Sequence, residues 1–432
     1  MDKTRVYLER SKFFPIDLWI GRENDLSLHD PLLQVIPHAT SRLKSLTVHT
    51  TPERIGPITT RLSHPAPHIE HLSIYCSSGF EITSNPILET VLLGGNLSSL
   101  HSLHLMRVRT ELSWRNMINL TSLTLGYTLP GDVSIGQLLA FLGSAPRLES
   151  VRLENATPTT GPQDGRLVSL ERLKLMSIQG DEPCSFLLNH LLIPVGTKLS
   201  ILANSFSRGF ESHLPRSLDN LRNLSDLTNI NLNFDGPCPD VRLTGPNGQI
   251  TLTCASPQVN PTSLAFECLG RIDTSKTEWL EIRRGNPPFS CPPYQVLLHM
   301  KNLRTLKLSR CQSPHLFIRA LRSGASSSGA AICPKLEELV LVPRTSSETF
   351  NIRDLITMAA ARALGGVKLR TVRIIGGQGG LDPGSALELG KYVLHVEYPS
   401  GNGAVNSDSD DSYGSGRDAG GDGRGSDANL WE

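Results

Sequence analysis

The sequence contains few charged and few aromatic side chains. Of its 432 residues, 19% are charged and 5% are aromatic, and Lys and Arg number 42 against 41 for Asp and Glu. The net charge of +1 provides no field of one sign that would attract nucleic acid or an anionic membrane. We therefore expect no nucleic acid and no membrane as a partner.

Long apolar runs are missing as well. The longest lies near Phe186–Val195, where Asn189 and His190 interrupt it. It is far shorter than the ~20 apolar residues that cross a bilayer. The chain begins MDKTRVYLERSK, with charges but no apolar stretch behind them, which is not the pattern of a signal peptide. These absences predict a protein of the cytoplasm or nucleus, and we expect a monomer.

Motifs of catalysis and of metal binding are also absent. The eight cysteines include no C-x-x-C pair, so we expect them to be reduced. There is no G-x-x-x-x-G-K-[ST] or G-x-S-x-G sequence, and we expect Gly376–Gly380 to lead into Leu381-Asp-Pro without a helix start. His64, His68 and His71 approach metal-ligand spacing, but two prolines interrupt them. We expect no enzyme, no metal and no cofactor.

What the sequence does contain is a recurring apolar motif, L-x-x-L-x-L, in which Ile or Val can replace Leu. Its copies are Leu43/Leu46/Val48, Ile69/Leu72/Ile74, Leu100/Leu103/Leu105, Leu120/Leu123/Leu125, Leu148/Val151/Leu153, Leu170/Leu173/Leu175, Leu227/Ile230/Leu232, Leu303/Leu306/Leu308, Leu336/Leu339/Leu341, Leu369/Val372/Ile374 and, in degenerate form, Thr277/Leu280/Ile282. Lys198–Asn204 predicts one more strand, with Leu199 and Leu202 inward. Such a repeat cannot bury its own apolar side, so each copy must stack on the next.

The distance between copies predicts what connects them. From 43 to 170 and from 303 to 369, successive motifs begin 20 to 33 residues apart, which equals or exceeds the ~20–29 residues of a leucine-rich repeat. The longer gaps leave room for a helix. Residues 135–142 have helical periodicity behind a capping box of Ser134 and Gln137, and residues 352–363 have it ahead of Gly365. The same pattern is less complete at 86–94, 184–193, 292–300 and 314–323.

Three regions follow from these patterns. Residues 1–30 hold a capping strand, with Ile16, Leu18 and Ile20 on one side. Residues 31–399 form an α/β leucine-rich-repeat solenoid, a horseshoe with parallel strands on the concave face and irregular helices and loops on the convex face. A β-hairpin at about 240–254, turning at Asn247-Gly248, is inserted in it. Residues 400–432 are rich in Gly, Ser and Asp and net acidic, so we expect a disordered tail.

The order of several stretches resembles fungal F-box proteins with leucine-rich repeats. The stretches are Tyr7–Lys12 followed by Pro15–Leu18, Cys184–Asn204, Asn302–Cys311, Cys333–Leu341 and Gly390–Pro399. The resemblance implies that the repeats select a protein substrate for a cullin-type, SCF-like ubiquitin ligase. It also implies that a helical F-box ahead of the repeats docks on a Skp-type adaptor.

The sequence departs from that family in two ways. The L-E-R-S-K stretch, which usually follows the F-box, begins here at Leu8, so we expect adaptor binding only if an F-box is encoded upstream. Only Cys311 matches the Asn or Cys that closes a regular repeat eight residues after its first Leu, so we expect no continuous Asn ladder. A ligase-independent scaffold that uses the same repeats therefore stays open as the alternative.

In an L-x-L strand the leucines point inward and their neighbours outward, onto the concave face. From these outward positions we expect a protein-binding surface that contains Tyr75, His104, Arg152, Arg172, Lys174, Asn229, Asn231, Trp279, Glu281, Arg283 and Lys307. Trp279, Glu281 and Arg283 form the densest group, and Trp and Arg dominate binding hot spots. The simpler interpretation is that these residues are polar because they are solvated, and that Trp279 is buried under the hairpin.

Overall fold

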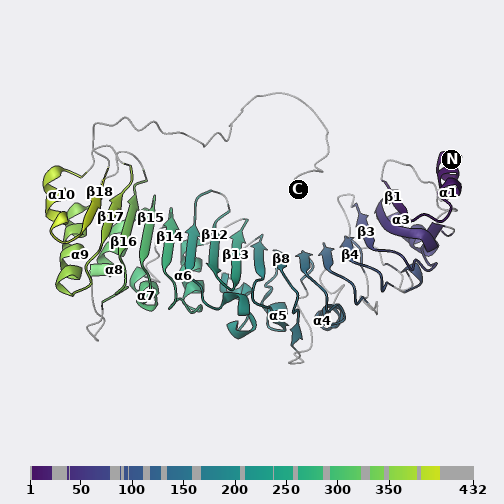
Figure 1. Cartoon of the computed structure of the whole chain (residues 1–432), viewed down its shortest axis with the longest axis horizontal. Helices are drawn as coiled ribbons and strands as arrows, with labels where there is room; N and C mark the ends of the chain where they lie inside the picture. Colours follow the sequence, from purple (N-terminus) through teal and green to yellow (C-terminus); the bar gives the residue numbers. More distant parts are fainter. Residues whose placement is uncertain are drawn as a thin grey trace, which may run out of the picture. The chain divides into compact units, whose positions relative to one another are not determined.

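The computed structural model describes residues 2–21, 37, 39–77, 88, 92–95, 97–109, 117–127, 134–157, 167–204, 210–236, 238–255, 261–285, 292–322, 331–344, 350–376 and 381–398. The chain divides into two units, Met1–Pro399 and Ser400–Glu432. The predicted tail lies outside the described residues. The first unit is a mixed α/β fold with a long, mostly parallel sheet of 16 strands (Figure 1).

The strands stand side by side in one row, with helices α4 to α7 along the same side of it (Figure 1). The order is β1-β2-β3-β4-β5-β6-β8-β10-β13-β12-β11-β14-β15-β16-β17-β18, and β7 and β9 form a separate pair. The strands are β1 Ile16–Ile20, β2 Leu43–Thr50, β3 His71–Cys76, β4 Ser102–Met106, β5 Ser122–Gly126, β6 Ser150–Glu154, β7 Val168–Ser169, β8 Leu175–Gly180, β9 Leu191–Leu192, β10 Lys198–Ala203, β11 Asn229–Asn233, β12 Asp240–Gly245, β13 Gly248–Cys254, β14 Trp279–Arg283, β15 Thr305–Ser309, β16 Glu338–Val342, β17 Thr371–Ile374 and β18 His395–Glu397.

Two ladders of apolar side chains hold this sheet together. Along most of the row the second and third apolar residues of each motif pair with their counterparts in the next strand, as Leu103 does with Leu123 and Leu105 with Leu125. Nearly all of these side chains are at most 2% exposed. Because each strand covers its neighbour's apolar side, the repeats bury one continuous core, as expected of a solenoid-like stack.

The predicted hairpin is confirmed as β12 and β13, but it is not an excursion from the stack. It takes two places in the sheet between β10 and β11, so that β13 runs parallel to β10 while β12 is antiparallel to both β11 and β13. Val241, Leu243, Ile250 and Leu252 are all fully buried. The hairpin joins the sheet because its alternating apolar side chains continue the two ladders.

Two expected registers were wrong. The strand assigned to Leu170/Leu173/Leu175 is β8, which begins only at Leu175 and points that side chain outward, 44% exposed. Its buried set is Leu173, Met176 and Ile178, an equally good motif three residues later. In β10, Leu199 is buried as expected, but the next inward residue is Ile201 and not Leu202.

The two best-supported helices are confirmed, whereas the expectation of no helix start at Leu381-Asp-Pro was wrong, because a helix begins at Pro383 with Asp382 as its N-cap. Helix α4 has the full capping box of Ser134 and Gln137, and α9 begins after Asn351 and ends at Gly365. The helices are α1 Asp2–Arg10, α3 Pro52–Arg61, α4 Ile135–Gly143, α5 Ser185–Leu188, α6 Pro261–Leu269, α7 Pro293–His299, α8 Pro314–Arg322, α9 Ile352–Leu364 and α10 Pro383–Gly390, and the 3-10 turns are η1 Thr40–Arg42, η2 Leu92–Gly95, η3 Phe210–His213, η4 Leu218–Asn220 and η5 Arg222–Leu224. Helix α3 contains Pro57 in its interior, a residue that disfavours a helix in a sequence-based prediction.

A left-handed residue recurs directly after several strands. Arg107, Tyr127, Asn155, Arg284 and Arg310 have φ between 48° and 57°. The backbone N–H of each donates to a carbonyl at the end of the next strand in the row, at 2.5–2.8 Å. For a side chain other than glycine this conformation costs about 1–2 kcal/mol. The turn keeps it because it satisfies a backbone donor and points the side chain off the end of the strand.

Side-chain rungs between repeats are present but scattered among the described residues. The Cys311 thiol donates to a backbone carbonyl of β14 at 3.3 Å, which places it as a repeat-closing residue. Asn119 and Asn302, each just before the first Leu of a motif, donate at 2.7 Å to the carbonyls of Ser98 and Ser275 in the preceding repeats. These rungs tie individual pairs of repeats rather than the whole row.

Candidate functional site

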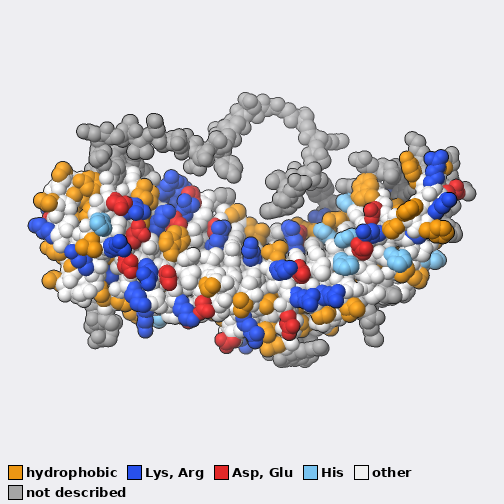
Figure 2. All heavy atoms as spheres, viewed as in Figure 1, with side chains coloured by type: hydrophobic (Ala, Val, Ile, Leu, Met, Phe, Trp, Pro, Cys, Tyr) orange, Lys and Arg blue, Asp and Glu red, His pale blue; other side chains and the backbone are white. Residues whose placement is uncertain are grey.

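The side of the sheet that carries the outward strand residues is here called the open face. Its side chains alternate with the buried ladders and are mostly half-buried, because neighbouring strands lie only ~4.8 Å apart and each side chain leans on the next. On the face shown in Figure 2, basic and acidic side chains are intermixed rather than separated by sign. Specific contacts order several groups of open-face residues, including Thr305, Glu338, Arg373 and Glu397 on β15 to β18. Two further groups contain most of the predicted residues.

The first group is a row of rings across β1 to β4, here called the aromatic row: Trp19, His49, Tyr75 and His104. Successive ring centroids lie 5.9, 4.5 and 4.5 Å apart, and the Tyr75 hydroxyl is 3.0 Å from Nδ1 of His104. Trp19, at the outer end, is 62% exposed. The row offers a partner a series of ring surfaces, tilted 30–51° against one another, with polar atoms at their edges.

The histidines of the aromatic row are held neutral. Burial, with smaller contributions from the positive charge of Arg152 and from His49, lowers the pKa of His104 to about 4. Burial also lowers the pKa of His49. Arg152 itself is neutralised by Glu154 on the same strand, with Nε 2.5 Å from the carboxylate. The predicted residues Tyr75, His104 and Arg152 therefore form a surface with little net charge.

The second group, here called the Glu281 cluster, contains four of the predicted residues. Glu281 is 6% exposed, and its carboxylate receives Arg283 at 3.2 Å, Lys307 at 3.1 Å and the Asn231 amide at 3.3 Å. Ser309 completes the cluster with a contact of 3.5 Å. The residues come from β11, β14 and β15, whose register places Asn231, Glu281 and Lys307 in one line.

Trp279 and Asn229 lie one step along the same strands. They face each other in register and precede the Glu281 cluster by two residues. Trp279 is half-buried and Asn229 is exposed, so Trp279 is not a fully buried core residue. On the other side of the cluster, Asn233 donates to Asp240 of the hairpin at 3.0 Å, and burial raises the pKa of Asp240.

Arg172 and Lys174 do not belong to this surface, contrary to the prediction. Both precede β8 and are exposed, and Lys174 pairs with Glu149 at 2.7 Å in the connection before β6. The error follows from the register of β8. Because the motif was placed three residues too early, positions in the preceding turn were assigned to the strand.

Several contributors to these groups were absent from the predicted set. Trp19 and His49 complete the aromatic row, and the alternation of Leu46 and Val48 was the available signal for His49. Arg284, Arg310 and Asp235 form ion pairs just beyond the ends of β11, β14 and β15. No residue preference indicates that an arginine will adopt a left-handed turn, so these positions required the structure.

Cys184 and His213 are close together, as in a catalytic Cys–His pair, but their pKa shifts have the wrong direction for catalysis. The Cys184 sulfur is 3.8 Å from Nδ1 of His213 and donates to the His213 carbonyl at 3.2 Å. Burial raises the pKa of Cys184 to about 12 and lowers that of His213 to about 4. A nucleophilic thiol needs shifts of the opposite sign. The pair is therefore a buried thiol and a neutral imidazole.

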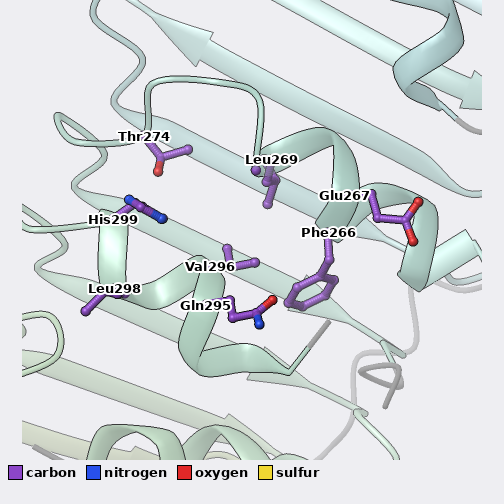
Figure 3. A pocket seen from close by; sticks show the side chains of 9 residues that line it. Phe266, Glu267, Leu269, Thr274, Gln295, Val296, Leu298 and His299 are labelled. Atoms are coloured by element: carbon purple, nitrogen blue, oxygen red, sulfur yellow. The ribbon is translucent and has the colours of Figure 1, made fainter. Parts of the chain in front are cut away.

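A cavity of about 290 Å³ lies between α6 and α7, away from the open face. Phe266 and Leu269 of α6 and Val296 of α7 line it, and Gln295 points toward Phe266 across it (Figure 3). It is at the lower limit of ligand pockets. Elsewhere in the described ranges, no three His, Cys, Asp or Glu side chains converge as metal ligands.

None of the helices in the described ranges is long and apolar enough to cross a membrane. The open face carries the aromatic row toward one end of the sheet and the Glu281 cluster toward the other, and we take it as the candidate site among the described residues. Comparison with protein-family models finds no match, and comparison with curated proteins finds none either.

Proposed function

We propose that the protein is a leucine-rich-repeat interaction module, a horseshoe that binds another protein with the open face on its concave side. The observation that carries this proposal is the Glu281 cluster beside Trp279. There, β14 and β15 bring an Arg and a Lys together on one buried carboxylate, and the half-buried Trp279 lies two residues before that carboxylate on β14. Aromatic and arginine side chains on a pre-ordered surface are what protein hot spots use.

We further propose that the captured protein is a substrate of a cullin-type ubiquitin ligase, in the cytoplasm or nucleus. This step is supported by the ordered resemblance of Tyr7–Lys12, Cys184–Asn204 and Asn302–Cys311 to F-box proteins with leucine-rich repeats. A row of sixteen strands also offers more than the ~800 Å² per partner of a standard interface. The alternative is a ligase-independent scaffold that uses the same face.

Proximity labelling with the full chain tests the binding proposal. Trp279→Ala should remove a specific set of labelled proteins, while Tyr294→Ala, an aromatic 47% exposed on α7, should leave that set intact. Both variants should keep the wild-type circular dichroism and denaturation midpoint, because neither side chain is fully buried. Identical labelling by both variants and the wild type would overturn the proposal.

Co-purification with a Skp-type adaptor tests the ligase step separately. If the full chain recovers the adaptor together with proteins lost on Trp279→Ala, it acts as a substrate-recognition subunit. If those proteins are recovered without adaptor, the scaffold alternative holds for this chain.

A further inference from the structure

Among the described residues, four basic side chains on β14 and β15, or directly after these strands, pair with two carboxylates. Arg283 and Lys307 share Glu281, as described above. Asp235, just after β11, receives Arg284 at 2.8 Å and Arg310 at 3.9 Å. Arg283, Arg284, Lys307 and Arg310 are here called the cationic edge. In the described part of the chain, these four cations share two carboxylates as ion-pair partners, and Asp240, which pairs with Arg242, lies near Arg283.

The carboxylates lie deeper than the three arginines, while the fourth cation, Lys307, is 31% exposed. The Glu281 side chain is 7% exposed and that of Asp235 38%, whereas Arg283, Arg284 and Arg310 are 47–52% exposed. A partner that approaches this edge therefore meets guanidinium groups first. Their surplus N–H donors match carboxylates in a bidentate geometry.

The backbone holds two of these arginines in place. Arg284 and Arg310 occupy the left-handed position after adjacent parallel strands, with φ of 52° and 54°. Each donates its backbone N–H to the end of the next strand, Arg284 to Ser309 and Arg310 to Val342. Their Cα atoms are thus set about one strand spacing, ~4.8 Å, apart. Such a pair is pre-ordered for two neighbouring acids on one extended chain.

We propose that the cationic edge binds a short segment rich in Asp and Glu that belongs to the protein partner. The inference rests on the proposed function, because the segment is part of the protein captured by the open face. Charge complementarity selects the occupant: the surplus is small and local, in a chain of net charge +1. A polyanion such as nucleic acid would instead require a long basic tract.

The test measures fluorescence anisotropy of a labelled peptide rich in Asp and Glu with the full chain. The control is the same peptide with Asn in place of Asp and Gln in place of Glu. The acidic peptide should bind, more weakly as salt rises, and the amide peptide should not. Arg284→Gln and Arg310→Gln should each weaken binding about tenfold.

Arg304→Gln is the matched control. Arg304 is 55% exposed and pairs with Glu337, but it lies before β15 rather than after it. Its substitution removes the same charge from the same repeat and should leave the affinity unchanged. Equal binding of the amide peptide, equal weakening by Arg304→Gln, or equally effective competition by a single-stranded oligonucleotide would each overturn the proposal.

The two experiments distinguish a wrong acidic-segment proposal from a wrong proposed function. If the acidic peptide does not bind but Trp279→Ala still removes labelled proteins, the open face binds proteins and only the acidic-segment proposal falls. If Arg284→Gln with Arg310→Gln removes the same labelled proteins as Trp279→Ala, with circular dichroism unchanged, the two surfaces act on one partner.

Discussion

Glu281 shows how a single residue can order a surface. Its carboxylate is buried on a face where most side chains are half-exposed, and two cations, an amide and a hydroxyl contact it. Removing one member of a buried ion pair leaves the remaining charge without its partner. The aromatic row is ordered differently, by stacking and one hydrogen bond, and holds its histidines neutral.

We expect Glu281→Gln to lower the free energy of unfolding by about 1–2 kcal/mol. This is less than for a fully buried pair, because Arg283 and Lys307 are partly solvated. Glu278→Gln, an exposed residue just before the same strand, is the control and should change stability little. Urea denaturation followed by circular dichroism measures both. Equal effects of the two substitutions would contradict a special role for Glu281.

The buried side chain of His213 should make the free energy of unfolding depend on pH. Burial lowers its pKa to about 4, whereas in the unfolded chain it is ~6.5. Between those values the unfolded state binds a proton that the folded state does not, so the free energy of unfolding falls as the pH drops below ~6.5. The slope should reach at most ~1.4 kcal/mol per pH unit. Above pH 6.5 this contribution should not change.

The check is the urea midpoint of the wild type and of His213→Gln at pH 7.5 and pH 5. The variant cannot take up that proton, so its midpoint should fall less over the same interval. A parallel fall in both proteins would assign the acid sensitivity to other groups. His104 acts in the same direction, but solvent screens its contribution more because it is less buried.

At the scale of the elements, the turn of the hairpin β12–β13 lies close to the backbone of neighbouring connections. A Cβ on Gly248, whose φ is +140°, would lie 2.6 Å from the Thr197 carbonyl oxygen and 2.9 Å from Cβ of Asn223. The Asn247 side chain also donates to Asp226 at 3.0 Å. The turn is thus wedged between neighbouring connections rather than projecting into solvent.

Gly248→Ala should destabilise the protein by more than Gly196→Ala. Gly196 has φ of +88° but nothing within 4 Å of an added Cβ, so its substitution costs only the backbone strain of about 1–2 kcal/mol. At Gly248 the contact with backbone adds to that strain. Chemical denaturation of the two variants compares them directly. Equal midpoints would show that the hairpin relaxes without loss.

The sequence predicted the helices correctly where their local capping and stop signals were complete. The capping box at Ser134 and the stop at Gly365 are short-range signals, and α4 and α9 form there. It failed where two registers were equally apolar, as at β8. It also missed α3, because Pro57 disfavours a helix locally whereas burial of Ile55 and Ile58 favours it in the folded protein.

At the scale of the molecule, each repeat contacts chiefly its neighbours, so stability should be local along the row. Leu306 is fully buried between Leu280 of β14 and Leu339 of β16. Leu306→Ala should cost about 2–5 kcal/mol as a buried leucine. Hydrogen exchange should rise in β14 to β16 and remain low in β3 to β6.

Leu123→Ala is the counterpart, since Leu123 holds the same ladder position in β5. It should raise exchange in β4 to β6 and spare β14 to β16. Hydrogen–deuterium exchange with mass spectrometry resolves the two patterns. A uniform rise along the chain after either substitution would mean that the sheet unfolds as one cooperative unit.

From the sequence alone came the stacked α/β architecture, the inward leucines and most of the outward positions, because a repeat with one apolar side can be buried only by another repeat. Tertiary structure decided which outward residues act together. Glu281 meets Asn231 because β11 and β14 are neighbours in the sheet, although a hairpin separates them in the sequence, and it meets Lys307 because β15 pairs with β14 in register. Likewise, Arg284 and Arg310 converge on Asp235 through left-handed turns that no arginine prefers by itself. Contacts between distant segments depend on register and strand order, and local spacing carries neither.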